Sequence, residues 1–98
     1  MFNNPRYLTR GIKAEIPILT QVLMWEMIDK MQVEKKDYLQ VFRLRTAEAN
    51  GELVQQIVHT QEQPPYENIV TINTKPVSQK IFVIDDVTHS TMLLADEY

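Results

Sequence analysis

The 98-residue chain contains no cysteine, which excludes disulfide bonds, thiolate metal sites and cysteine nucleophiles. It also has no apolar run near the roughly 20 residues that a membrane-spanning helix requires. The first residues, MFNNPRYLTRG, lack the apolar segment of a secretory signal peptide. These absences predict a cytoplasmic protein with no membrane contact. The length and the ordinary apolar fraction of 44% predict a single domain over residues 1–98.

Glycine is nearly absent, with only Gly11 and Gly51 in the whole chain. Two isolated glycines cannot build a Walker-type phosphate loop or a dinucleotide-binding loop. Gly51 follows Asn50, and the Asn-Gly pair predicts a tight β-hairpin because both residues tolerate positive φ. Gly11 follows a short extended stretch, residues 6–10, and is expected to mark a turn or a bulge.

The net charge of −3 gives the chain no general attraction to nucleic acid or to anionic lipid. The charge is nevertheless unevenly placed, with three basic residues in the first thirteen positions and four acidic residues in the last eighteen. The two ends are expected to lie side by side in the fold, to meet across a symmetric dimer, or simply to carry scattered solvated charge. The residues concerned are Arg6, Arg10 and Lys13, and Asp85, Asp86, Asp96 and Glu97.

One main helix is predicted from about residue 17 to residue 32. Pro17 suits a helix start, and no glycine or further proline interrupts the segment. At 100° per residue, one broad apolar face gathers Leu19, Leu23, Met24, Met27, Ile28 and Met31. A second apolar stripe on the far side consists of Ile18, Val22 and Trp25. A helix with two apolar faces predicts a second partner besides its own sheet, such as a loop, a terminal strand or another subunit.

The remaining apolar segments predict an antiparallel sheet of four to five strands, so that the fold class is α+β. A two-residue hairpin at Asn50-Gly51 pairs residues whose numbers sum to 101, which places Phe42 opposite His59 and Arg43 opposite Val58. Pro64-Pro65 is expected to end the second strand of this hairpin. Further strands are expected over residues 68–72, 80–84 and 91–95, with a short terminal helix as the alternative for the last segment.

The strongest candidate for chemistry is the segment Asp85-Asp86-x-x-His89. Oxygen and imidazole donors on a loop can hold a divalent metal or act in acid–base catalysis, with Glu62 or Asp96 as a further ligand. The alternative is a polar turn, in which these side chains accept hydrogen bonds from nearby backbone N–H groups. A triad of Asp86, His89 and Ser90 is not expected, because adjacent residues of a strand point to opposite faces. His59 is expected at the edge of the core, and no cofactor is predicted.

Two further surfaces are candidates for binding. The protein-interaction candidates are Ile18, Val22 and Trp25 on the helix, and Pro64, Pro65 and Tyr66 after the hairpin. The nucleic-acid candidates are Arg6, Tyr7, Arg10 and Lys13, where basic side chains surround an aromatic ring, with Arg43 and Arg45 as a second basic group.

The segments RYLTRGI, DYLQVFRL, QEQPPY and KIFVIDDVTHSTMLLADEY resemble those of a family of small uncharacterised proteins from low-GC Gram-positive bacteria. The resemblance extends over nearly the whole chain. It implies a stand-alone bacterial cytoplasmic domain with no assigned activity and no assigned site residues.

The sequence therefore predicts an uncharacterised bacterial protein that acts as a non-enzymatic binding or regulatory module through protein–protein contacts. Its protein partner is not identified by the sequence, and a second copy of the chain is one candidate. The first alternative is a small metal-dependent or acid–base enzyme that uses Asp85, Asp86 and His89. The second alternative is a nucleic-acid-binding accessory protein.

Overall fold

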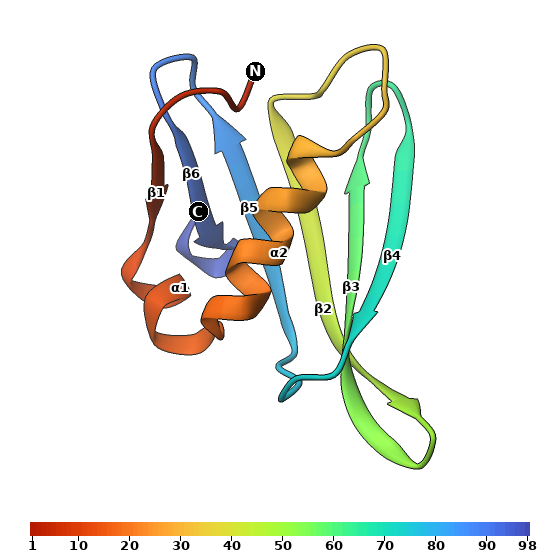
Figure 1. The fold of residues 1–98 in the computed structure, drawn as a ribbon. Helices are drawn as coiled ribbons and strands as arrows, with labels where there is room; N and C mark the ends of the chain where they lie inside the picture. The colour runs from red at the N-terminus through yellow and green to blue at the C-terminus, as the bar shows by residue number, and fades with distance from the viewer.

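The computed structural model describes residues 1–98 as an α+β fold in which two helices accompany one six-stranded mixed sheet. The sheet order is β1-β6-β5-β2-β3-β4, and all neighbours are antiparallel except β1 and β6, which are parallel (Figure 1). The helices are α1 (Arg10–Glu15) and α2 (Ile18–Asp29), and a 3-10 turn η1 covers Ala95–Glu97. The strands are β1 (Arg6–Leu8), β2 (Leu39–Ala49), β3 (Glu52–Gln61), β4 (Tyr66–Ile72), β5 (Gln79–Asp85) and β6 (Ser90–Leu94).

The β2–β3 hairpin has the predicted register. Phe42 lies opposite His59 and Arg43 opposite Val58. Asn50 and Gly51 have φ values of 53° and 81°, as a two-residue turn between right-twisted strands requires. The prediction from the Asn-Gly pair is confirmed.

The prediction of four to five antiparallel strands and one main helix was only partly right. The short extended stretch after Pro5 forms β1, which adds a sixth strand and pairs in parallel with β6. The main helix is shorter than predicted, since it ends at Asp29 rather than near residue 32. Residues 90–94 form a strand antiparallel to β5, and the terminal turn η1 follows it.

Gly11 was expected in a turn or a bulge but lies inside α1. The hydroxyl of Thr9 caps this short helix by accepting a hydrogen bond from the N–H of Ile12 at 3.4 Å. The N–H of Gly11 donates to Glu97 Oε2 at 3.1 Å, and a Cβ at this position would lie 2.7 Å from the Glu97 carboxylate. Glycine here allows the close approach of the Glu97 carboxylate, which a larger residue would displace.

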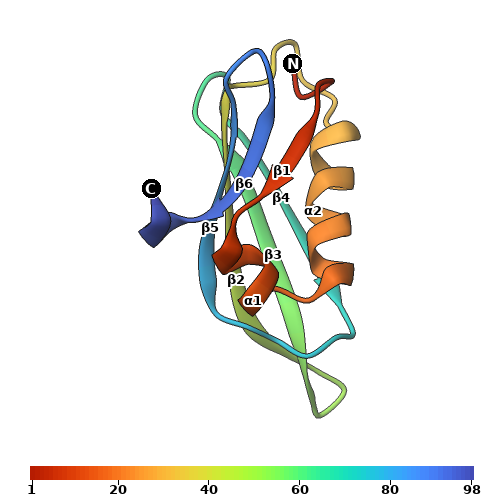
Figure 2. The ribbon, with the colours of Figure 1, turned by 90° about the vertical axis from the view of Figure 1, so that its left-hand side faces the viewer.

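Helix α2 lies across β5 and β2 on one face of the sheet, and the C-terminal segment projects from the other side (Figures 1 and 2). The side chains of alternate strand residues point toward α2 and form the core with it. Leu19, expected on the core face of α2, is instead 58% exposed. The largest cluster of buried apolar residues is Phe2, Ile12, Ile16, Met24, Met27, Ile28, Phe42, Leu44, Ile57, Ile81, Val83, Met92 and Leu94.

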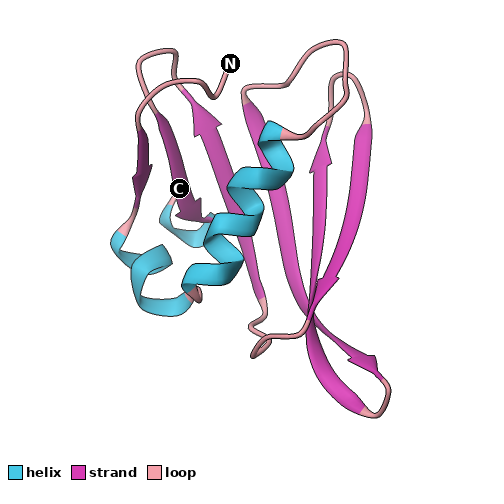
Figure 3. Cartoon of the chain, in the orientation of Figure 1, coloured by secondary structure: helices cyan, strands magenta, loops and turns pink.

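The two ends of the chain lie on the same half of the sheet, because β1 pairs with β6 (Figure 3). The basic and acidic residues at the two ends do not form ion pairs with one another. Arg6 is paired with Asp29 of α2 instead. No helix of the structure is both long and apolar enough to cross a membrane.

Phe2 is the contribution to the core that the sequence did not indicate. Its side chain is fully buried although it precedes every strand and helix, and its φ is 67°. A non-glycine residue in this left-handed region is disfavoured. The packing of the ring and a hydrogen bond from its N–H to Asp85 offset that cost.

We expect Phe2→Ala to lower the free energy of unfolding by about 3–5 kcal/mol, because it leaves a cavity in a closed core. The matched control is Phe82→Ala on the opposite face of the sheet, where the ring is only half-buried. That change is expected to cost about 1 kcal/mol. Urea unfolding of both variants measures the difference. Equal losses would contradict the assignment of residues 1–4 as an anchored part of the core.

Candidate functional site

Asp85 is the last residue of β5, and its side chain lies on the α2 side of the sheet with 6% exposure. One carboxylate oxygen, Oδ2, accepts the N–H of Phe2. The other, Oδ1, accepts the N–H of Val87 at 2.7 Å and the Nδ2 donor of Asn4 at 3.2 Å. The carboxylate thus binds the segment before β1, which reaches the core beside it.

Asp86 has a separate set of partners within the turn that links β5 to β6. Its Oδ1 accepts the N–H groups of Thr88 and His89 at 3.1 and 2.9 Å. Its Oδ2 lies 3.0 Å from Nε2 of His89. Val87 adopts a φ of 84° within this turn. These are the hydrogen bonds with which aspartate stabilises a local reversal of the chain.

The predicted metal or acid–base residues therefore diverge. Asp86 and His89 are in contact, whereas Asp85 points to the N-terminal segment. The structure contains no group of three or more His, Cys, Asp or Glu side chains that could hold a metal ion. Ser90 is buried, and its hydroxyl donates to Oδ1 of Asn4 rather than to His89.

Hydrogen bonding shifts the pKa of both aspartates in the same direction. Burial alone raises the pKa of Asp85, but N–H groups of Phe2 and Val87, the Asn4 amide and the N-terminal charge lower it below its ordinary value. The pKa of Asp86 is lowered chiefly by the backbone N–H of His89. Both groups are thus held as carboxylates, a state suited to accepting hydrogen bonds and not to acting as a general acid near neutral pH.

We expect Asp85→Ala to lower the free energy of unfolding by about 2–4 kcal/mol, because it leaves buried N–H donors without an acceptor. Asp86→Ala removes the carboxylate that accepts hydrogen bonds within an exposed turn, and it is expected to cost clearly less because water can replace that acceptor. Thermal and urea unfolding measure both changes. Similar costs for the two variants would contradict the different structural roles of these residues.

A chain of buried polar side chains joins β2 and β3 under the C-terminal end of α2. His59 is fully buried, stacks on Phe42 with ring centroids 4.2 Å apart, and places Nε2 2.7 Å from Oε1 of Gln40. Nε2 of Gln40 donates to Oε1 of Gln61 at 2.8 Å. Gln61 in turn donates to the carbonyl groups of Lys35 and Pro64 at 3.1 and 2.9 Å. The chain therefore fixes both the loop before β2 and the turn after β3.

The contact with Gln40 determines which ring nitrogen of His59 carries the proton. An amide oxygen only accepts hydrogen bonds, so Nε2 is the protonated nitrogen of the neutral ring. Nδ1 is buried without a hydrogen-bond partner. A second proton there would place an unpaired charge in the core, and burial accordingly lowers the pKa of His59 to about 4.

This pKa makes the stability of the protein depend on pH. In the unfolded chain His59 gains a proton near pH 6.5, whereas in the fold it stays neutral down to about pH 4. The unfolded state binds the extra proton first, so stability is complete above pH 6.5 and falls by about 3 kcal/mol as the pH drops toward 4. Asp85 loses its stabilising charge only below pH 3.8, outside this window.

We expect His59→Gln to remove the fall in stability between pH 6.5 and 4, since the substituted residue does not titrate. The control is His89→Gln, which removes the other histidine and leaves the fall in place. Urea unfolding at several pH values measures the slope. A fall that survives His59→Gln, or that disappears in His89→Gln, would show that another group causes it.

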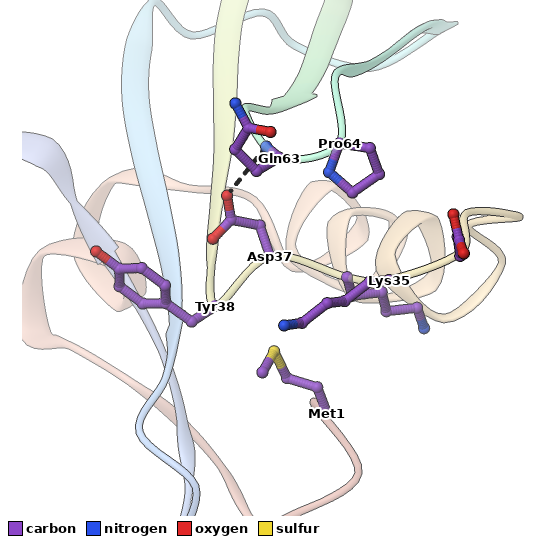
Figure 4. Close-up of a pocket in the computed structure, with 8 residues that line it drawn as sticks. Met1, Lys35, Asp37, Tyr38, Gln63 and Pro64 are labelled. Atoms are coloured by element: carbon purple, nitrogen blue, oxygen red, sulfur yellow. Dashed lines mark hydrogen bonds between the residues drawn. The ribbon is translucent and has the colours of Figure 1, made fainter.

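A cavity of about 720 Å³ lies between the loop before β2 and the turn after β3 (Figure 4). Both oxygens of Asp37 are already engaged, with the N–H of Leu39 and with the N–H of Gln63, each at 3.3 Å. Glu34 is the other carboxylate of the cavity wall, and no histidine lines the cavity. Its lining residues are Met1, Glu34, Lys35, Lys36, Asp37, Tyr38, Gln63 and Pro64.

The predicted interaction residues lie in two places. Ile18 and Val22 are 76% and 54% exposed, but Trp25 is half-buried beneath the guanidinium of Arg6, which lies 4.7 Å from its ring. Of the three residues of the second apolar stripe, only Ile18 and Val22 are therefore accessible to a partner. After β3, Pro64 lines the cavity, Pro65 is exposed, and Tyr66 packs edge-on against His59.

The predicted nucleic-acid residues do not form one surface. Arg6 points to the α2 side of the sheet, where it binds Asp29 and the carbonyl group of Phe2. Tyr7, the next residue of β1, points to the opposite face. Arg10 and Lys13 lie on α1.

A group of three basic residues lies on the sheet face turned away from α2. The sequence predicted two of them, Arg43 and Arg45, but not the third, Lys80. Arg43 and Lys80 are direct neighbours on β2 and β5, and Arg45 follows on β2. The arginines were visible from their spacing in one strand. Lys80 joins them only because β5 pairs with β2, and no local pattern indicates that pairing.

The fold and these contacts define a small α+β protein whose polar residues hold its loops together and form no complete catalytic set. The sequence pattern of one family matches residues 5–97. The chain belongs to this family, which is described as staphylococcal protein of unknown function, DUF960. The resemblance to uncharacterised proteins of low-GC Gram-positive bacteria is thereby confirmed.

One solved structure is similar to this chain over nearly its whole length. It is the crystal structure of a protein of unknown function from Enterococcus faecalis, with a TM-score of 0.78 and 24% sequence identity. The match covers 98% of this chain and 92% of the other. At this identity the similarity supports the fold alone. No curated protein matches the chain.

Proposed function

We propose that this protein is a non-enzymatic binding module that acts through protein–protein contacts and associates with a second copy of itself through β4. The observation that carries the proposal is the free edge of the sheet. β4 is the last strand in the sheet order and pairs only with β3. Its outward N–H and C=O groups are therefore available to another strand.

The composition of β4 favours strand addition. Its seven residues, YENIVTI, contain no proline and no lysine, the residues that commonly protect an edge. Ile69 is 51% exposed on this strand. At the other end of the sheet β1 has only three residues, which is too short for extended pairing. The two edges thus differ, and β4 is the one suited to a partner.

A second copy fits β4 because the strand is complementary to itself. In an antiparallel pair centred on Ile69, residues whose numbers sum to 138 face each other. Ile69 then meets Ile69 of the second copy, and Glu67 meets Thr71. Glu67 is the one charged residue of β4, so this register places no like charges directly opposite each other. Main-chain hydrogen bonds supply affinity, and the paired isoleucines supply apolar contact.

We expect the wild-type protein to have the mass of a dimer by light scattering at micromolar concentration, and Ile69→Lys to have the mass of a monomer. A lysine at this position places two like charges opposite each other in the proposed pair. The matched control is Leu53→Lys, the same type of change at a 64% exposed position of the β2–β3 hairpin. This control is expected to remain dimeric.

Two results would contradict self-association through β4. The first is a wild-type protein that stays monomeric at all accessible concentrations. The second is a dimer that Leu53→Lys disrupts and Ile69→Lys leaves intact. Circular dichroism of each variant establishes that a change in mass does not reflect unfolding.

A further inference from the structure

We infer that the sheet face turned away from α2, here called the open face, binds an acidic segment of another protein. The inference adds the chemistry of a partner to the proposed binding role. It uses a surface distinct from the outward edge of β4, so that either proposal can fail while the other holds.

The first observation is a group of three cations without counter-ions. Arg43 of β2 and Lys80 of β5 lie directly opposite each other, and Arg45 is the next β2 residue on the same face. None of the three takes part in an ion pair, since the pairs in the structure are Arg6–Asp29, Lys30–Glu26 and His89–Asp86. Like charges directly opposite each other in a sheet are unfavourable. A bound carboxylate would remove that repulsion.

The acids on this side of the sheet are few, and none forms an ion pair with Arg43, Arg45 or Lys80. On η1, Glu97 is engaged with Thr9, Gly11 and Leu94, and Asp96 is the other acid. Alternation along the strands places only two acidic strand residues on the open face. Glu67 lies on β4 at the sheet edge, two strands away from Arg43, and Glu52 lies beside the hairpin turn. The chain as a whole has a net charge of −3, which makes this concentration of positive charge a local feature.

The second observation is an apolar area beside the cations. Val41, Phe82 and Leu93 are neighbours across β2, β5 and β6, one step along the strands from Arg43 and Lys80. The C-terminal turn η1 lies on this side of the sheet (Figure 2). The ring of Tyr98 contacts Phe82, and Leu93 is only 8% exposed, so the free part of this area is Val41 with the exposed part of Phe82. A hollow of about 220 Å³ opens on the same face, with Val41 and Arg43 in its lining. This area suits apolar side chains of a segment whose carboxylates reach the cations.

The arrangement also indicates how the segment lies. The hollow is bordered on its far side by Asp37 and Glu62, which repel further acids. Acidic side chains of the partner are therefore placed toward Arg43 and Lys80, and apolar ones over Val41 and the hollow.

Single-stranded nucleic acid fits the same surface less well. A base would stack on Phe82, but the edge of Tyr98 meets this ring at 5.7 Å and the Lys80 ammonium lies 5.5 Å from its centre. A long polyanion also extends beyond the three cations and encounters the net negative charge of the chain. A short acidic segment contacts the cations alone.

The test uses fluorescence anisotropy with a labelled peptide of alternating Glu and Leu. A peptide of about eight residues, at ~3.3 Å per residue, crosses a sheet of six strands, ~24 Å wide. The comparison probes are a peptide of alternating Lys and Leu and an oligothymidylate of similar length. The expected result is binding of the Glu-Leu peptide alone, weakening as salt is raised from about 0.05 M to about 0.5 M.

The double variant Arg43→Gln/Lys80→Gln is expected to bind the Glu-Leu peptide about tenfold more weakly, since two ion pairs are lost. The matched control, Lys13→Gln/Lys75→Gln, makes the same change in net charge at exposed positions away from the open face and is expected to leave affinity within about twofold. The first double variant removes a repulsive pair, so its melting temperature is expected to be no lower than that of the wild type.

Failure of the wild type to bind the Glu-Leu peptide, or equal loss of affinity in the two double variants, would overturn the inference. Binding of the oligothymidylate with the same dependence on Arg43 and Lys80 would replace it with a nucleic-acid surface. Ile69 lies in the same cross-strand row as Lys80, Arg43 and Val58. The monomeric variant Ile69→Lys, which adds a cation to that row, is therefore expected to bind the peptide at least as tightly as the wild type. Peptide binding by a monomeric wild type would support the open face and contradict only self-association through β4.

Discussion

A helix of twelve residues has to cover a sheet of six strands, and most features of this structure follow from that mismatch. Such a helix is ~18 Å long and ~10 Å wide, whereas six strands span ~24 Å. α2 therefore covers only the middle of one face, over β5 and β2. The segment before β1 and helix α1 fill the space on one side of it with Phe2, Ile12 and Ile16. On the opposite side of the sheet the only helical segment is the three-residue turn η1.

The same mismatch explains why polar residues that resemble catalytic ones have structural roles. Segments without regular structure must cover what α2 leaves open, and their backbone groups need partners when they are buried. Asp85 supplies those partners to the segment that contains Phe2, and the glutamines joined to His59 supply them to the loop before β2. The carboxylates, amides and imidazole are thus engaged before any substrate arrives. Among the surfaces that remain free, a strand edge and a sheet face are those that suit binding by extended segments.

Features set by neighbouring residues were predictable from the sequence, whereas features set by distant pairing were not. Asn50-Gly51 fixes the hairpin register because a two-residue turn leaves one alignment of its strands. The parallel pairing of β1 with β6 joins residues more than eighty positions apart, and no local pattern encodes it. The same is true of Phe2 and of Lys80, whose places depend on which strands are neighbours. Leu19 shows the related limit for helices, since periodicity identifies an apolar face but not how far the sheet extends beneath it.

The pairing of β1 with β6 has a consequence for folding. Residues 6–8 leave the ribosome long before residues 90–94, with which β1 pairs. The local β2–β3 hairpin can therefore form early, whereas β1 has no partner strand until β6 is synthesised. Until β6 is present, the edge of β5 and the apolar side of the early helices stay exposed. A sheet completed by such a long-range contact forms slowly. The entropy of closing the long loop is lost before the stabilising contact between β1 and β6 is made. Apolar surface and an unpaired strand edge that are exposed during the interval before β6 arrives favour aggregation.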